Sequence, residues 1–373
     1  MLHYATAASV KMPMPAPKQR DFHPFSCGRH YSLNMPSIAR NSSEKQKPFG
    51  GSKEKEPQSV RFVVIDESHD GQRLDNFLLS FSKGVPKSHV YRIVRSGEVR
   101  VTKNRATVSQ RLAAGDTVRI PPMRISEKTH APSAKPFSQD ELKVLYEDRD
   151  ILVIDKPAGL AAHGGSGIAF GLIERLRATR PDAPMLELAH RLDRDTSGAI
   201  VVCKTRKALV RFQEQIREGN ICKRYRLLVA GDWVNERENV KLPLFKYTLP
   251  SGERRVRVDR EKGLFSHTIF TLLTRFKTAS YLEAELKTGR THQIRVHAAS
   301  LGFPLVGDAK YGDYEFNEKV AAGYLGVPFK RMFLHAFSIE FRHPVTGVTL
   351  RVVSELPGEC EQLLTSLKNK QKS

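Results

Sequence analysis

The chain has 373 residues, of which 40% are hydrophobic, and this excludes a wholly disordered protein because a buried core can form. It carries 61 Lys and Arg against 40 Asp and Glu, a net charge of +21 that favours nucleic acid over a membrane surface as partner. No apolar run approaches the roughly 20 residues that cross a bilayer, so we expect no membrane segment. The four cysteines are scattered without a metal-binding spacing, which predicts a reducing compartment and no bound metal.

Residues 1–57 mix Pro, Ser, Lys and Gly without a hydrophobic period, which predicts a disordered basic N-terminal extension. An organelle-targeting peptide is one alternative, although Asp21 and the Lys/Glu run of residues 44–56 weigh against it. Translation from Met35 is another, since the folded part would be unaffected.

Residues 60–122 predict a small helical and stranded module. Apolar residues recur at i, i+3, i+4 and i+7 over residues 74–81, and a shorter run with the same spacing, residues 90–94, ends before Gly97; each predicts a helix. Alternating apolar and polar residues predict strands over 98–102 and 116–120.

Basic side chains gather on the polar sides of these elements. A solvated surface would explain any one of them, but the cluster favours phosphate contact. The stretch DGQRLDNFLL…GVPKSHVYRIVRSGEVRVTKNR…RLAAGDTVRI resembles the S4-like (αL) RNA-binding domain of ribosomal proteins and RNA-modifying enzymes. We therefore expect RNA contacts from Lys87, Arg92, Arg95, Arg100, Lys103 and Arg105.

The Pro-rich residues 123–139 predict a linker, and a second domain is expected over residues 140–373. Its strands outnumber its helices and often follow one another directly, which favours a largely antiparallel mixed-sheet α+β fold over a doubly wound parallel one. Strands are expected at 151–155, 199–205, 223–230, 266–276, 281–287, 334–341 and 348–353, and helices near 172–176, 209–216, 291–301 and 360–367.

The densest group of ionisable residues is HRLDRDTSG, residues 190–198, which predicts a loop just before a buried strand. Charges held beside a core strand must pair or shift their pKa, so the carboxylates of Asp193 and Asp195 are candidate catalytic groups. A salt-bridged surface turn is the structural alternative.

A second group lies at KTGRTHQIRVH, residues 287–297. A helix capped by Thr291 would place Arg295 one turn further on, where its guanidinium could meet a carboxylate of the first group. His292 and His297 are five residues apart and do not share a helix face, so a zinc site is not expected.

Two further segments leave their roles open. The glycine loop HGGSG, residues 163–167, lacks the endings of phosphate-binding and dinucleotide-binding loops, so it gives little support for nucleotide binding. Tyr225 opens a predicted strand and is either an ordinary strand aromatic or a platform for a nucleobase. Without a metal or cofactor motif, the candidate chemistry is one that a carboxylate performs unaided.

The runs DKPAGLAAHGGSG, HRLDRDTSGAIVVCK, KRYRLLVAG, KTGRTHQIRVHAASLGFPLVGDAKYG and FLHAFSIEF resemble the RluA-type pseudouridine synthases over about residues 60–370. The resemblance implies isomerisation of uridine to pseudouridine after base flipping, with no cofactor. It is closest to the branch that acts on several uridines of 23S ribosomal RNA, although related enzymes modify other large-subunit or transfer RNA sites.

The resemblance also implies roles for single residues. Asp193 matches the essential catalytic carboxylate, which leaves Asp195 a structural one, and Arg295 matches its ion-pair partner. Tyr225 matches the aromatic residue that packs on the target uracil. Arg191 matches the side chain that fills the place of the flipped nucleotide.

Two alternatives from other classes remain at this level. A non-catalytic ribosome-assembly factor would share the basic module, and a metal-dependent nuclease would use Asp193 with Asp195. The expectation is a monomeric enzyme of the bacterial cytoplasm that acts on RNA, in which Asp193 serves either as nucleophile or as the base that yields a glycal.

Overall fold

The computed structural model describes residues 59–82, 85–123, 134–138, 141–165 and 169–372. The expected extension over residues 1–57 lies outside the described residues, as does most of the expected linker over 123–139.

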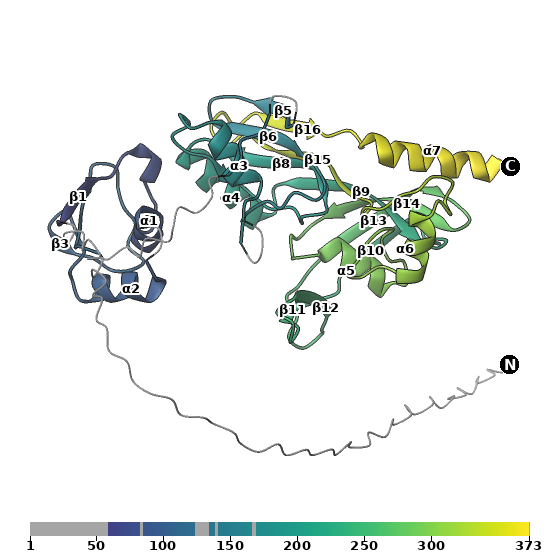
Figure 1. Ribbon diagram of the computed structural model, residues 1–373, viewed down its shortest axis with the longest axis horizontal. Helices are drawn as coiled ribbons and strands as arrows, with labels where there is room; N and C mark the ends of the chain where they lie inside the picture. The colour runs from purple at the N-terminus through teal and green to yellow at the C-terminus, as the bar shows by residue number, and fades with distance from the viewer. Residues whose placement is uncertain (1–58, 83–84, 124–133, 139–140, 166–168, 373) are drawn as a thin grey trace, which may run out of the picture. The chain divides into compact units, whose positions relative to one another are not determined.

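The first described part, residues 59–123, is a four-stranded antiparallel sheet with two helices (Figure 1). The strands follow the order β1-β4-β2-β3, and the apolar faces of the helices share one core with the sheet. Its elements are β1 (Arg61–Val64), the 3-10 helix η1 (Glu67–His69), α1 (Leu74–Phe81), α2 (Lys87–Arg95), β2 (Arg100–Val101), β3 (Asn104–Arg105) and β4 (Thr117–Ile120).

Both helices expected here are confirmed, and each boundary has a local cause. Pro86 precedes the first turn of α2, and Gly97 adopts a φ of 80° just after the helix ends, a conformation that suits glycine. The strand expected over 98–102 is only two residues long in β2, because Thr102 and Lys103 have positive φ angles and turn the chain into β3.

The second part forms one large mixed sheet in the described chain, in the order β10-β13-β14-β9-β15-β8-β6-β5, with β16 beside β15 and β7 beside β8. Its strands are β5 (Lys143–Glu147), β6 (Ile151–Lys156), β7 (Glu187–Leu188), β8 (Ser197–Cys203), β9 (Cys222–Ala230), β10 (Arg237–Val240), β13 (Thr268–Arg275), β14 (Ala279–Leu286), β15 (Leu334–Arg342) and β16 (Thr349–Val353). A separate hairpin consists of β11 (Leu244–Thr248) and β12 (Arg254–Val258). Its helices are α3 (Leu172–Thr179), α4 (Arg206–Glu218), α5 (Gln293–Ser300), α6 (Tyr314–Ala321) and α7 (Gly358–Lys372).

The described strand pairs of this sheet are antiparallel except β8 with β15, so the expected α+β class is confirmed. Both faces of β6 are buried, which explains why its sequence is a continuous apolar run rather than an alternating one. Leu152 and Ile154 pack in the core that contains α3, whereas Ile151 and Val153 pack in the core that contains α4. Figure 1 shows these two helices beside the β6–β8 region.

Two boundaries differ from the sequence predictions. The strand expected over 199–205 runs from 197 to 203, because the Thr205 side chain accepts a hydrogen bond from the Ala208 amide and caps α4. The helix expected from Thr291 begins at Gln293, and His292 precedes it in a left-handed conformation with a φ of 54°. Helix α6, the β11–β12 hairpin and strands β1, β3, β5, β7 and β10 were not predicted.

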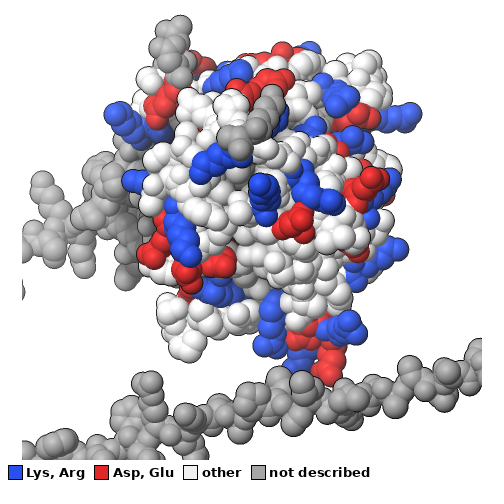
Figure 2. All heavy atoms as spheres, turned by 90° about the vertical axis from the view of Figure 1, so that its right-hand side faces the viewer, with Lys and Arg blue, Asp and Glu red and all other residues white. Residues whose placement is uncertain are grey.

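Basic and acidic side chains interleave with uncharged ones on the face shown in Figure 2, so this face carries no continuous basic surface. Among the described residues, no helix combines the length and apolar character that crossing a membrane requires. Cys203, Cys222 and Cys360 are free thiols.

Candidate active site

The HRLDRDTSG segment connects β7 to β8, and the packing of β8 fixes where the segment ends. Every residue of β8 is buried, and the strand lies between β6 and β15. Gly198 has a φ of 111°, and a Cβ added there would lie 2.4 Å from the Ala336 carbonyl oxygen. Glycine at this position therefore allows β8 to approach β15, which anchors the loop that carries Asp193.

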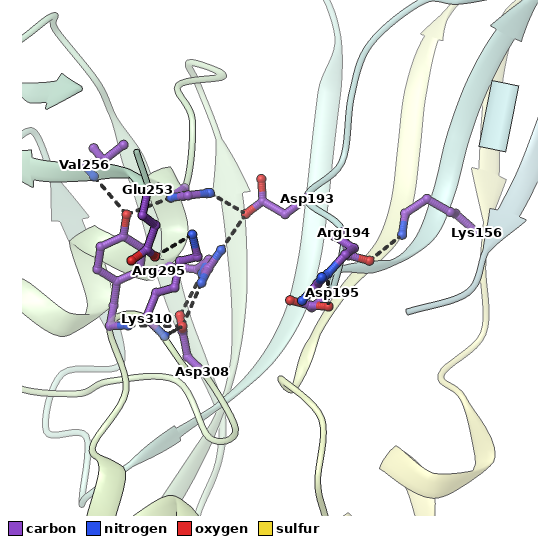
Figure 3. A network of polar contacts seen from close by, with 11 residues as sticks. Lys156, Asp193, Arg194, Asp195, Glu253, Val256, Arg295, Asp308 and Lys310 are labelled. Carbon is purple, nitrogen blue, oxygen red and sulfur yellow. Dashed lines mark hydrogen bonds and ion pairs between the residues drawn. The ribbon is translucent and has the colours of Figure 1, made fainter. Parts of the chain in front are cut away.

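A buried arginine joins this loop to α5. Arg295 Nη1 donates to Asp193 Oδ2 at 3.1 Å, so the expected contact between the two segments is present (Figure 3). Its Nε and Nη2 atoms each donate to one carboxylate oxygen of Asp308, both at 2.7 Å. Asp308 therefore fixes the guanidinium plane through a bidentate pair and leaves Nη1 for Asp193.

The three groups differ in exposure. Arg295 is 5% exposed and Asp308 is 1% exposed, whereas 27% of the Asp193 side chain remains accessible. Burial lowers the pKa of Arg295, but the ion pairs with Asp308 and Asp193 outweigh it and raise this pKa above its usual range. Burial would raise the pKa of Asp308, and its bonds from Arg295 hold it below the ordinary value. The partly accessible carboxylate of Asp193 thus faces a guanidinium that stays charged.

The start of α5 is shaped by side-chain bonds rather than by a Thr291 cap. The Gln293 side-chain oxygen accepts from the Arg290 amide at 3.0 Å and from the Thr288 hydroxyl at 2.8 Å. The mostly buried His292 side chain lies between Tyr311 and Asp193, with its Nδ1 2.7 Å from the Tyr311 hydroxyl and its Nε2 3.9 Å from Asp193 Oδ2. Burial lowers the pKa of His292, although Asp193 opposes the shift.

Lys156 holds the other side of the loop that carries Asp193. This fully buried side chain donates from Nζ to the carbonyls of Pro157 and Leu160 at 2.8 Å and of Arg194 at 3.0 Å. Figure 3 shows Lys156 reaching Arg194, the residue after Asp193. Burial lowers the pKa of Lys156 to about 7. One ammonium therefore ties the loop to the segment that follows β6.

The His190 side chain anchors the loop to the core through contacts with Val201 and Phe212. Its Nε2 accepts a hydrogen bond from the Val201 amide at 3.2 Å, and its ring stacks on Phe212 with 6.3 Å between centroids. Burial lowers the pKa of His190 to about 3, with a smaller contribution from the Lys223 charge. The imidazole is thus neutral at physiological pH and positions the loop.

We expect His190 to make the folding stability pH-dependent. Below pH 6.5 the unfolded chain binds a proton at His190 that the folded protein does not bind until about pH 3. The free energy of unfolding should therefore decrease as the pH is lowered from about 6.5 to about 3, by up to about 1.4 kcal/mol per pH unit from this group. Urea unfolding of the wild type and His190→Gln at several pH values measures the difference; parallel pH curves for the two proteins would contradict the assignment.

A cleft of about 1140 Å³ brings the expected site residues together, and it is lined by Arg191, Asp193, Tyr225, His292 and Arg295 among others. Burial raises the pKa of Tyr225, and Asp193 adds to this shift, so the phenol stays neutral. Arg191 is exposed and forms no ion pair with a described carboxylate. Its guanidinium is thus available to a ligand.

Asp195 lies apart from this arrangement. Its carboxylate accepts from Arg194 Nε at 3.1 Å and is 45% exposed, and it does not line the cleft. In the described ranges, the group of His, Cys, Asp and Glu side chains that could surround an ion is Asp148, Asp150 and His343, which includes neither Asp193 nor Asp195. The nuclease alternative therefore gains no support from the geometry.

Comparison with known proteins places the chain in a family. The family model described as RNA pseudouridylate synthase matches residues 150–300, and the S4 domain model matches residues 72–118. The chain is 50% identical to "Ribosomal large subunit pseudouridine synthase C" of Pasteurella multocida, over 85% of this chain and 96% of that protein. This chain belongs to the RluA family of pseudouridine synthases.

Other relatives agree with this membership. The proteins of the same name from Haemophilus influenzae and Escherichia coli K12 are 47% and 46% identical, over 83% and 84% of this chain and 96% and 98% of theirs. The solved structure "Human RNA Pseudouridylate Synthase Domain Containing 4" has the same fold, with a TM-score of 0.50, 24% identity and coverage of 60% of this chain and 92% of that one. The chain is therefore an RNA pseudouridine synthase, an isomerase that acts on RNA.

The residues expected to contact RNA in the S4 domain are all exposed and fall into two groups. Lys87, Arg92 and Arg95 project from α2, and the first and last lie over the Tyr91 ring at 5.3 and 5.9 Å from its centroid. Arg100, Lys103 and Arg105 belong to the β2–β3 hairpin.

Three residues that contact Arg295 or the Asp193 loop were not predicted from the sequence. Asp308 and Tyr311 lie in the GDAKYG run, and Lys156 lies in DKPAG, but no role followed from either run alone. The Tyr311 ring lies 5.0 Å from the Arg295 guanidinium, on which it packs. The available signal was the position of Asp308 and Lys156 at the ends of apolar segments, which marks loops near the core.

Replacing Lys156 with Met should reduce pseudouridine formation while the fold is kept. Three carbonyls lose their donor, and the backbone beside Asp193 loses its tie to the loop after β6. A displacement of about 1 Å in a catalytic group reduces the rate roughly 100-fold, so we expect a fall of kcat on that order. Single-turnover kinetics measures it, with the exposed Lys143→Met as the matched control; equal rates for both variants would exclude the positioning role.

Proposed function

We propose that this enzyme converts specific uridines of 23S ribosomal RNA to pseudouridine, with Asp193 as the catalytic carboxylate and without a cofactor. The observation that supports it best is the chain of contacts from Asp308 through Arg295 to the accessible Asp193 in the cleft. The substrate follows from relatives named for the large ribosomal subunit, which match this chain over nearly their whole length.

The target uridine must leave the RNA helix to reach Asp193. Unstacking and unpairing a base takes roughly a few kcal/mol. Arg191, exposed beside the cleft, would fill the gap, and the Tyr225 ring would stack on the uracil; both contacts offset the free energy of base flipping.

The reaction breaks the bond between C1′ of the ribose and N1 of uracil, and the uracil turns within the cleft. A bond then forms between C1′ and C5, and the proton of C5 is lost while N1 gains one. Atoms and electrons balance without an oxidant, a reductant or water. Asp193 begins the reaction either as a nucleophile or as the base that removes a sugar proton to give a glycal, and both routes use the same carboxylate.

Water must stay away from the detached uracil, since hydrolysis would leave an abasic ribose. The inner wall of the cleft is suited to this, because Tyr225 is 7% exposed and Arg295 is 5% exposed. A bound uracil would cover the remaining accessible surface of Asp193.

The proposal is tested with purified protein and 23S ribosomal RNA transcribed in vitro, in excess EDTA and without nucleotide. Carbodiimide mapping should then reveal new pseudouridines at a small number of positions. Unmodified RNA, or modification that depends on added metal, would contradict the proposal.

We also propose a monomeric enzyme of the cytoplasm, where ribosomal RNA is made in bacteria, with an S4-like domain over 60–122, a linker over 123–139 and a catalytic domain over 140–373. All four proposed site residues belong to the last of these segments. Sedimentation of the free enzyme tests the monomer.

Arg191→Ala should slow the reaction mainly on structured RNA. Arg191 can fill the place of the flipped base only where that base leaves a gap in a stacked helix. The reaction on an unpaired oligonucleotide should therefore depend less on Arg191. We expect kcat/KM to fall roughly 10- to 100-fold on a stem-loop, since a few kcal/mol of flipping free energy is no longer offset, and by much less on an unstructured oligonucleotide. The ratio of the two values is the measurement, and equal losses on both substrates would be inconsistent with gap filling.

A further inference from the structure

Four side chains form a row across the small sheet of the S4 domain, which we call the arginine row. The strand register places Phe62 of β1 opposite Arg119 of β4, Arg119 opposite Arg100 of β2, and Arg100 opposite Arg105 of β3. Directly opposed residues of neighbouring strands point to the same face of a sheet. Neighbouring strands lie about 4.8 Å apart, so the row spans about 14 Å.

The row lies on the face turned away from the domain core. Val118 and Val101, the next residues on β4 and β2, are 0% and 3% exposed and pack with the two helices. Since side chains alternate along a strand, the row occupies the opposite face. At β3 it meets the end of α2, because Arg105 donates to the Arg95 carbonyl at 2.6 Å.

The three arginines of the row lack a neutralising partner. None forms an ion pair with a carboxylate of the described chain, and each donates instead to a backbone carbonyl: Arg119 to Glu98 at 2.6 Å, Arg105 to Arg95 at 2.6 Å and Arg100 to Lys103 at 3.4 Å. A guanidinium has five N–H groups, so each keeps donors for a ligand. Like charges directly opposite one another destabilise a sheet, which an anionic ligand would relieve.

Phe62 adds an aromatic surface at the end of this positive row. Its side chain is 67% exposed, and Val64, on the same face of β1, is 66% exposed. Exposed aromatic rings beside a basic groove are how proteins hold single-stranded nucleic acid, because a base stacks on the ring while the phosphates meet the cations.

We propose that the arginine row binds a single-stranded segment of the RNA substrate, with phosphates on Arg100, Arg105 and Arg119 and one base stacked on Phe62. The proposal rests on the proposed function for the identity of the RNA. Beyond the contacts already expected from Arg100 and Arg105, it assigns RNA binding to Arg119 and to Phe62 of β1, both outside the residues matched by the S4 model.

The charged part is tested with the full-length triple variant Arg100→Gln, Arg105→Gln and Arg119→Gln, since Gln still donates to the backbone carbonyls. The dissociation constant for 23S ribosomal RNA transcribed in vitro is measured at several KCl concentrations. Three lost phosphate contacts should reduce the slope of log K against log [KCl] by about 2. The matched control is Lys143→Gln, Lys207→Gln and Lys330→Gln, three exposed lysines elsewhere in the chain.

The stacking part is tested with Phe62→Leu and Phe62→Trp. Leu keeps apolar bulk without a ring, and it should weaken binding about fivefold to 100-fold with an unchanged salt slope, whereas Trp should bind as the wild type does. Wild-type affinity in Phe62→Leu, an unchanged slope in the triple Gln variant, or the same loss of slope in the lysine control would each overturn the proposal.

The proposed function and the proposed arginine row can be refuted by different results. Absence of pseudouridine in RNA incubated with the wild type would refute the proposed function, while affinity and its salt dependence would still report on the arginine row. Conversely, if the triple Gln variant and Phe62→Leu modify and bind RNA as the wild type does, only the proposal for the arginine row is overturned.

Discussion

Asp193→Asn is expected to abolish pseudouridine formation while RNA binding persists. The amide has nearly the shape of the carboxylate but can neither attack the substrate nor accept a proton. Removing a catalytic nucleophile or base lowers kcat by about four orders of magnitude or more. The fold should survive, because Arg295 keeps its bidentate pair with Asp308. Single-turnover assays on 23S ribosomal RNA, with binding measured separately, check the prediction.

The matched control is Asp195→Asn, two residues away in the same loop. Asp195 is 45% exposed and pairs with Arg194 at the surface, where an ion pair contributes little to stability. This control variant should therefore retain near wild-type turnover. If Asp193→Asn kept substantial activity, or if Asp195→Asn lost as much, the catalytic carboxylate would have to be sought elsewhere.

Elements could be predicted from the sequence where one physical factor decides the local structure. Strands β6 and β8 are buried on both faces, so their apolar runs could be read directly. Two dense charged segments had to find partners, which predicted that Arg295 meets a carboxylate of the first segment, and the family resemblance selected Asp193 as that carboxylate.

The parts that were missed depend on contacts between distant segments. A buried lysine such as Lys156 is rare, and its three acceptors are backbone carbonyls, which leave no pattern in the sequence. The position of Asp308 after an apolar segment did not identify its partner, because Arg295 is 13 residues earlier and meets it through the loop after α5. The helix start was misplaced for the same reason, since Gln293 and Tyr311 stabilise a left-handed His292 that local preference disfavours.

The second large effect is expected for Arg295→Leu, which removes the partner of two carboxylates at once. Asp193 loses the cation that fixes its position, and the loss of one such group reduces catalysis by about 100- to 1000-fold. Asp308 becomes an unpaired buried carboxylate, and breaking a buried pair in this way destabilises a protein by about 3–5 kcal/mol. Both the rate and the free energy of unfolding should therefore fall.

The double variant Arg295→Leu with Asp308→Asn separates the two effects. The substituted amide would keep an oxygen for the backbone N–H groups of Lys310 and Tyr311, from which Asp308 accepts at 2.8 and 3.1 Å, but would carry no charge. Most of the lost stability should return, measured by urea unfolding, because no buried charge is left without a partner. The rate should stay as low as in the single variant, because Asp193 still faces no guanidinium. Recovery of turnover along with stability would mean that Arg295 supports the fold alone and has no part in holding the catalytic carboxylate.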